Sequence, residues 1–367
     1  MVCFFLSGAA GLIYEVAWTK SLGLLFGHTA YASTTVLAVF MAGLASGSLW
    51  LGQRAERVRQ PLALYGWIEL GVAATGAASL AGLSGVRWLY YHLYPLVSHS
   101  GLSLLAVRIV GASLVLIVPS FLMGGTLPIL VCGLTPRGSK GSTQIGRRVS
   151  RLYWVNTLGA VAGAIAAGFL LLPTVGLRLS VASAVLLNAC VGGVALRVSR
   201  HFELIPPISP ASQARSTPPP RQNAQSGKPA LVGFLFAAFA LVGATAISYE
   251  IAWVRLLATT LGSSTYAFTL MIATFLLGIT LGSMFYERWA SRHQPSLATF
   301  ARTQTLISMA ALLFLVFFRE LPRVLPAILE ITDDSFSGLV LASLLPQDWL
   351  CCRRPWCSDS ISLRSWR

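Results

Sequence analysis

Two glutamates stand inside apolar stretches, where a charge is costly and therefore needs a partner or a task. Glu15 and Glu250 each follow a tyrosine directly, and each is followed three residues later by a tryptophan and five residues later by a cation. Tyrosine and tryptophan can donate hydrogen bonds to a carboxylate, and a carboxylate inside a membrane can bind a cationic solute or carry a proton. The candidate intramembrane site comprises two sets of four residues: Tyr14, Glu15, Trp18 and Lys20, and Tyr249, Glu250, Trp253 and Arg255.

The two sets belong to an internal duplication. Residues 8–48 align with residues 243–283 without a gap, and 16 of the 41 paired residues are identical. The glutamate, its tyrosine and its tryptophan are kept in both copies, whereas other positions diverge. A third candidate carboxylate, Glu69, has the neutral Gln304 at the corresponding position, so the duplication does not repeat its charge.

Two interpretations of Glu15 and Glu250 stay open. In the functional one, the pair binds a cationic substrate or carries a proton within the membrane. In the structural one, each is neutralised by Lys20, Arg255 or Arg108 and holds helices together. Because a helix turns by about 100° per residue, positions five apart lie about 140° apart, and Glu15 does not face Lys20 on its own helix. A partner is therefore expected on another helix.

Three pairs of glycines are spaced four residues apart within apolar stretches. This spacing lets two helices approach closely in lipid. Packing within the chain explains such pairs more simply than dimerisation does. The pairs are Gly43 and Gly47, Gly159 and Gly163, and Gly278 and Gly282.

Membrane helices must position these residues. Of the 367 residues, 55% are hydrophobic and only 11% are charged. A soluble core cannot be this apolar, and several apolar runs reach the roughly 20 residues that cross a bilayer. The sequence predicts an all-α polytopic membrane protein with nine spans: 3–26, 30–51, 61–84, 105–133, 152–174, 177–197, 230–258, 264–286 and 297–318.

The net charge of +15 reflects membrane topology rather than nucleic-acid binding. Basic residues gather after every second span, for example Arg147, Arg148 and Arg151 after the fourth, while the alternate loops hold few. This positive-inside pattern predicts a cytoplasmic N-terminus and loops that attract anionic lipids of the bilayer. The six cysteines form no Cys-x-x-Cys pair, so neither a metal nor a cofactor is expected.

The chain divides into two halves. Residues 198–229 are rich in proline and serine and predict a cytoplasmic linker. Residues 1–197 hold six spans, so residues 230–346 re-enter from the same side, as an incomplete second repeat of three to four spans. Parallel repeats of this kind are the arrangement of major facilitator transporters. Residues 347–367, rich in Arg, Trp, Ser and Cys, predict an atypical tail that fits translation in a wrong frame.

Motifs along residues 4–346 carry a family resemblance. Residues 5–18 read FLSGAAGLIYEVAW, residues 121–128 read FLMGGTLP, and residues 146–163 read GRRVSRLYWVNTLGAVAG. In this order, they resemble the membrane region of bacterial proteins that fuse a transporter of the major facilitator type to a spermidine-synthase-like domain. The resemblance implies a bacterial inner-membrane location and a soluble aminopropyltransferase domain. The sequence shows no strand with a glycine-rich turn to match that domain, so this chain alone is not expected to perform aminopropyl transfer.

Three functions stay open at this point. In the first, the chain is an integral membrane module that anchors or serves an aminopropyltransferase domain of the polyamine type. In the second, it is an autonomous carrier that moves a small, cationic solute by rocking its two halves around Glu15 and Glu250. In the third, it is a membrane scaffold without catalysis.

Overall fold

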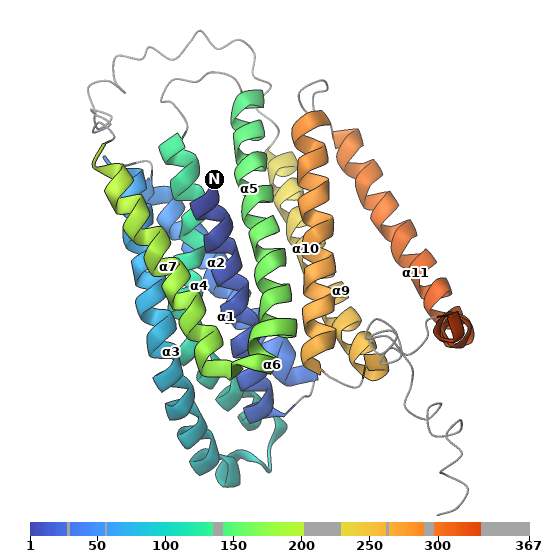
Figure 1. Ribbon diagram of the computed structural model, residues 1–367. Coiled ribbons are helices and arrows are strands. Elements are labelled where there is room, and N and C mark those ends of the chain that lie inside the picture. The colour runs from blue at the N-terminus through green and yellow to red at the C-terminus, as the bar shows by residue number, and fades with distance from the viewer. Residues whose placement is uncertain are drawn as a thin grey trace, which may run out of the picture.

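Long helices make up the described part of the chain. The computed structural model describes residues 1–27, 30–55, 57–134, 142–201, 229–261, 264–289 and 297–331. Its helices are α1 (Val2–Phe26), α2 (Ala30–Ala55), α3 (Pro61–Val97), α4 (Gly101–Leu134), α5 (Ser142–Ile165), the π-helical segment η1 (Ala166–Leu171), α6 (Leu172–Thr174), α7 (Gly176–Ser199), α9 (Pro229–Leu261), α10 (Ser264–Trp289) and α11 (Leu297–Ile331) (Figure 1). Most of the predicted linker and the whole predicted tail lie outside the described residues.

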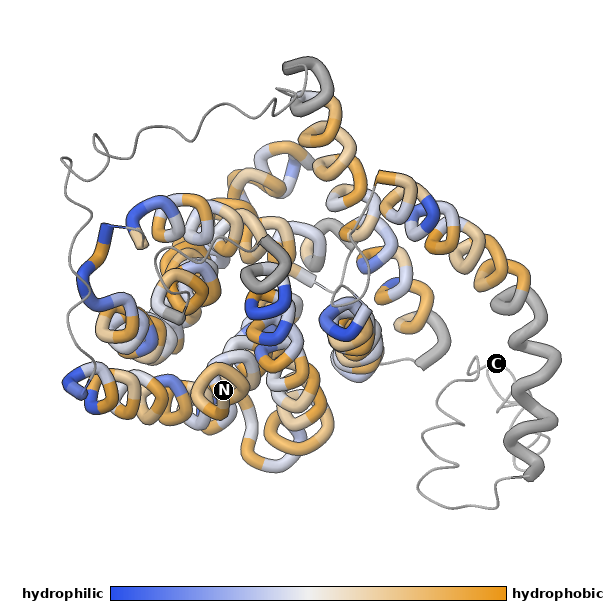
Figure 2. The backbone as a smooth tube through the Cα atoms, turned by 90° about the horizontal axis from the view of Figure 1, so that it is seen from above, coloured by the Kyte–Doolittle hydropathy of each residue, from blue (hydrophilic) through white to orange (hydrophobic). Residues whose placement is uncertain are grey.

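Nine helices in the described part are long and apolar enough to cross a membrane, as the sequence predicts. The same residues contain no β-strand. Seen end-on, hydrophobic residues run along most of the length of each helix, and strongly hydrophilic ones are few (Figure 2). The chain is therefore an all-α protein built for a membrane. The parallel relation of its two halves stays a prediction.

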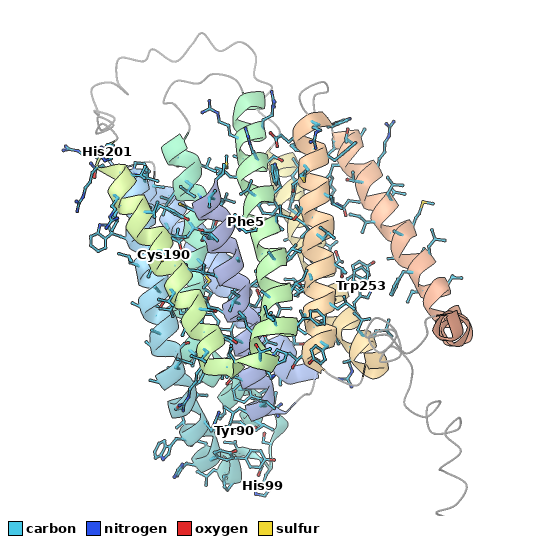
Figure 3. All side chains as sticks on the ribbon, in the orientation of Figure 1. Phe5, Tyr90, His99, Cys190, His201 and Trp253 are labelled. Carbon is cyan, nitrogen blue, oxygen red and sulfur yellow. The ribbon has the colours of Figure 1, made fainter. Side chains whose placement is uncertain are left out.

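Helix α3 is longer than predicted. The predicted span ends at residue 84, whereas the helix continues for thirteen more residues and ends at Val97. The 37 residues of α3 extend over about 55 Å, whereas the hydrocarbon layer is about 30 Å thick. The additional turns carry the exposed rings of Trp88 and Tyr91, which suit a membrane surface, and Figure 3 labels Tyr90 and His99 at this end. Hydropathy marks where a helix lies in lipid rather than where its backbone hydrogen bonds stop.

Helix α1 packs against α5 through glycines on both helices. Gly8 of α1 faces the backbone carbonyl of Asn156, and Gly159 and Gly163 of α5 face the carbonyls of Phe5 and Ala9. A methyl group at any of these three glycines would overlap the facing backbone. Glycine therefore lets the two helices come closer than any other residue would, which favours packing in lipid.

Helix α2 packs against α4 in the same way. Gly43 and Gly47 of α2 face Ser120 and the carbonyl of Phe121, and Gly124 of α4 lies equally tightly against α2. Their duplicated counterparts in α10 differ. Around both Gly278 and Gly282, no neighbouring atom of the described residues lies within 4 Å of the place where a methyl group would stand.

The second half meets the first along α5 and α10. The Ser150 hydroxyl of α5 donates to the carbonyl of Ser283, at 2.9 Å. The Trp154 Nε1–H donates to Oε2 of Glu287, at 2.8 Å. Helix α10 runs beside α5 in Figure 1, and α11 lies further out. The apolar stretch of α11 has no buried side chain, and that of α9 has few, so α10 provides most of the contact between the halves.

Replacing Trp154 with phenylalanine is expected to loosen this contact, because one aromatic ring is kept while the five-membered ring that carries the N–H is lost. A hydrogen bond to a charged group contributes about 1.5 to 3 kcal/mol, and the free energy of unfolding in a mixed detergent should fall by about 1.5 kcal/mol. Tyr153→Phe, at a neighbouring position whose side chain is partly exposed, is the matched control. Equal stability of the two variants would show that the Trp154–Glu287 bond does not stabilise the contact.

Candidate functional site

The two duplicated carboxylates lie near each other, although 235 positions separate them in the sequence. Glu15 on α1 and Glu250 on α9 are both buried, and they are close enough for their charges to interact. One carboxylate oxygen of Glu15, Oε1, is buried without a hydrogen-bond partner. The fold thus buries two carboxyl groups, one from each half.

Among the residues that the structure describes, no basic side chain forms an ion pair with Glu15 or Glu250. Neither Glu15 nor Glu250 forms an ion pair there with Lys20 or Arg255. Arg255 points away from the core, because its side chain is exposed. Carboxyl groups in such an apolar surrounding can bind a positively charged group.

Arg108 corrects one part of the structural interpretation. Its Nη2 donates to the backbone carbonyl of Phe26, at 2.7 Å, and so binds the last residue of α1. Helix C-termini carry unpaired carbonyls and partial negative charge, and a guanidinium satisfies both. Phe26 is eleven residues beyond Glu15, or about 16 Å along the helix. The guanidinium of Arg108 therefore stabilises the end of α1 rather than the carboxylate of Glu15.

The aromatic residues beside Glu15 hold α1 against α3. The rings of Tyr14 and Trp18 stack with centroids 5.0 Å apart, and Trp18 Nε1–H donates to the hydroxyl of Ser79 at 2.9 Å. The ring of Tyr14 lies against Gly76, where a side chain would collide with it. Its hydroxyl is buried without a hydrogen-bond partner. In this copy, neither ring therefore donates a hydrogen bond to Glu15.

The second copy keeps the stacking and loses the burial. The rings of Tyr249 and Trp253 stack with centroids 5.8 Å apart. Figure 3 labels Trp253 among the helices of the second half. Trp253 is only partly buried, whereas Trp18 is completely buried. The duplicated cluster is thus structurally tight in the first half and more open in the second.

Glu69 forms a second, separate polar cluster. Its side chain is completely buried on α3. Ser7 Oγ of α1 donates to its Oε1 at 2.6 Å, and Asn188 Nδ2 of α7 donates to its Oε2 at 2.5 Å. The Tyr65 hydroxyl lies close to the same carboxylate but has no hydrogen bond of good geometry. Three helices of the first half therefore converge on one carboxylate.

Sequence reasoning missed two members of this cluster. Asn188 is a lone amide in an apolar span, and Ser7 is one of several small residues at the start of α1. Both residue types are common in membrane helices for local reasons, because hydroxyls and amides can bond to their own helix. A polar residue in the middle of an apolar span was the available signal for Asn188. Only the packing of α7 on α3 gives it a partner.

Metal-binding groups of the usual protein type are not found in the described residues. No three His, Cys, Asp or Glu side chains gather there. Cys3, Cys132 and Cys190 carry free thiols. Cys351, Cys352 and Cys357 lie outside the described residues.

The similarity to known proteins is distant. No family model and no solved structure match the chain. The polyamine aminopropyltransferase of Mycobacterium tuberculosis is 29% identical over 194 residues, which are 53% of this chain and 34% of the relative. Polyamine aminopropyltransferase 1 of Streptomyces coelicolor is 24% identical over 178 residues, 48% of this chain and 29% of the relative. The matched part spans about a third of the length of these relatives.

Proposed function

We propose that this chain is an integral membrane module of a polyamine-aminopropyltransferase-like protein, and that Glu15 and Glu250 receive a cationic amine within it. Two findings support the module: nine helices suited to a membrane, and the distant similarity to polyamine aminopropyltransferases. In this proposal, aminopropyl transfer belongs to a separate soluble domain, which the module anchors or serves. The helices of the described part hold no sheet for such chemistry.

The observation that carries the amine-binding role is the pair of buried carboxylates. Glu15 and Glu250 come from different halves and interact electrostatically, and no basic side chain of the described part is paired with them. Two nearby ionised carboxylates repel each other unless one of them takes up a proton or a cation lies between them. A polyamine carries several ammonium groups on a flexible apolar stem, so it matches two carboxylates in an apolar surrounding.

Binding of radiolabelled spermidine to the purified chain in lipid nanodiscs tests this role. The double variant Glu15→Gln with Glu250→Gln keeps the shape of both side chains and removes both charges. Its affinity is expected to fall at least about tenfold, which corresponds to about 1.4 kcal/mol. Glu287→Gln, an equal change at the end of α10 that keeps an oxygen to accept from Trp154, should bind as the unchanged protein does. Equal binding by the double variant would make the two carboxylates structural.

A carrier is the second candidate function, and the placement of the pair favours it. One carboxylate comes from each half, so a relative movement of the halves would change the distance between them and the affinity for a cation. Uptake of labelled spermidine into proteoliposomes separates the candidates. Uptake that the double variant loses supports the carrier, and binding without uptake supports the module. A chain that neither binds nor transports amines would be a scaffold, and both proposals would fail.

A further inference from the structure

We propose that the first half contains a binding site for one monovalent metal cation, of which Na⁺ is the representative, at Glu69 between α1, α3 and α7. The site is distinct from the amine-binding pair. Its carboxylate is completely buried, in a span that is apolar enough to lie in the membrane. It takes hydrogen bonds from Ser7 and Asn188 on two other helices. This inference stands independently of the proposed function, because it concerns other residues and another ligand.

The charge of the cluster is unbalanced. Both groups that donate to Glu69 are neutral, since Ser7 gives a hydroxyl and Asn188 an amide. Each carboxylate oxygen accepts one of these hydrogen bonds, as the oxygens of an ionised carboxylate can. No basic side chain of the described part pairs with it, and the titratable groups that face the cluster are Tyr14, Tyr65 and Cys3. A single buried negative charge therefore lacks a counter-charge.

Buried oxygens without partners show where a cation would be held. Oδ1 of Asn188 is buried and accepts no hydrogen bond, and the hydroxyl of Tyr65 is buried without one. Together with the carboxylate of Glu69 and the hydroxyl of Ser7, they form a set of oxygen donors from three helices. Unsatisfied buried oxygens are uncommon in folded proteins, and a bound ion is one of the explanations. Within the described residues, no basic side chain pairs with these oxygens.

The donor chemistry selects a monovalent, hard cation. Carboxylate, amide and hydroxyl oxygens suit hard metal ions rather than those that prefer sulfur or imidazole. Calcium and magnesium sites use several oxygens, commonly with more than one carboxylate or with bound phosphate. Within the part of the chain that the structure describes, Glu69 is the only acidic side chain that forms hydrogen bonds with Ser7 and Asn188. One negative charge is balanced by one positive charge.

The location ties the site to α1. Ser7 lies eight residues before Glu15 on the same helix, which is about 12 Å along its axis. An ion bound at Glu69 would fix the first turns of α1 to α3 and α7, and with them the direction in which α1 presents Glu15. Occupancy of the cation site would therefore influence the position of the other carboxylate.

Thermal unfolding of the full chain in detergent tests the proposal. Choline chloride is replaced stepwise by NaCl at constant ionic strength and constant pH, so that only the identity of the cation changes. The unfolding temperature is expected to rise and to saturate with Na⁺, as it does when a ligand binds only the folded state. Retention of ²²Na⁺ by the purified chain in an equilibrium dialysis gives the same half-saturation by a direct method.

Variants decide whether the effect belongs to Glu69. Glu69→Gln should raise the Na⁺ concentration for half-saturation at least about tenfold, and Ser7→Ala should raise it less. Glu287→Gln is the matched control outside the cluster. A Na⁺ response that Glu69→Gln leaves unchanged would overturn the proposal. So would a protein whose stability depends on pH through Glu69 and shows no difference between Na⁺ and choline at any pH, because a proton would then neutralise the carboxylate.

Discussion

Gly47→Ala is expected to destabilise the protein strongly, whereas Gly282→Ala, the same change at the duplicated position, is expected to be tolerated. In α2 the added methyl group would overlap the backbone carbonyl of Phe121 on α4. Backbone atoms of a packed helix cannot move aside locally, so the two helices must separate. Overpacking of this kind costs about 2 kcal/mol or more. In α10, no neighbouring atom of the part of the chain that the structure describes lies within 4 Å of the added methyl group.

The sign of the effect should differ between the two copies. Alanine favours a helix over glycine by about 1 kcal/mol, so Gly282→Ala should be neutral or stabilising by up to about that amount. Reversible unfolding in a mixture of mild and denaturing detergents measures both variants. Gly8→Ala and Gly243→Ala form a second matched pair, because Gly8 faces the carbonyl of Asn156 and Gly243 has no described neighbour within 4 Å of an added methyl group. Equal losses in both members of a pair would show that the close contacts in the first half do not hold it together.

The different glycine contacts of the two copies show which features the duplication predicts and which it does not. Residues 8–48 and 243–283 share the residues that form a helix and its close contact. The sequence therefore predicts the same element twice, and α1 with α2 and α9 with α10 follow that prediction. A helix contact also needs a partner, and the partners of Gly43 and Gly47 come from α4. The conformation of one segment cannot reveal whether a partner stands beside it.

The positions of the membrane spans were predictable for a physical reason. Crossing about 30 Å of hydrocarbon requires about 20 apolar residues in one run, and few other structures need such a run. Partners across the fold leave no comparable trace. Asn188 donates to Glu69 from 119 positions away, and Arg108 binds the carbonyl of Phe26 from 82 positions away. Neither distance follows from the local pattern, so the sequence identified Glu69 and Arg108 as charged groups in apolar spans without assigning what they bind.

Trp18→Ala is expected to have the largest effect of any truncation in the duplicated cluster. The Trp18 ring is completely buried, stacks on Tyr14 with centroids 5.0 Å apart and donates a hydrogen bond to Ser79. Removing a buried tryptophan from a soluble core costs about 3 to 5 kcal/mol. In lipid the unfolded helices stay in an apolar medium, so mainly the lost packing counts, and about 3 kcal/mol is expected. The free energy of unfolding in mixed detergents is the measurement.

Trp253, the duplicated counterpart of Trp18, shows how much of the effect comes from packing rather than from the type of residue. Trp253→Ala removes the same atoms from a partly buried position, where the ring stacks on Tyr249 and meets Phe314, and it should cost less than half as much as Trp18→Ala. Trp18→Phe keeps an aromatic ring but loses the N–H and part of the buried indole, so it should cost about 2 kcal/mol. If Trp18→Ala and Trp253→Ala are equally tolerated, the aromatic pair does not fix α1 to α3. Glu15, three residues from Trp18, would then not be held rigidly relative to Glu250. The two carboxylates would have to take up their binding arrangement after the cation enters.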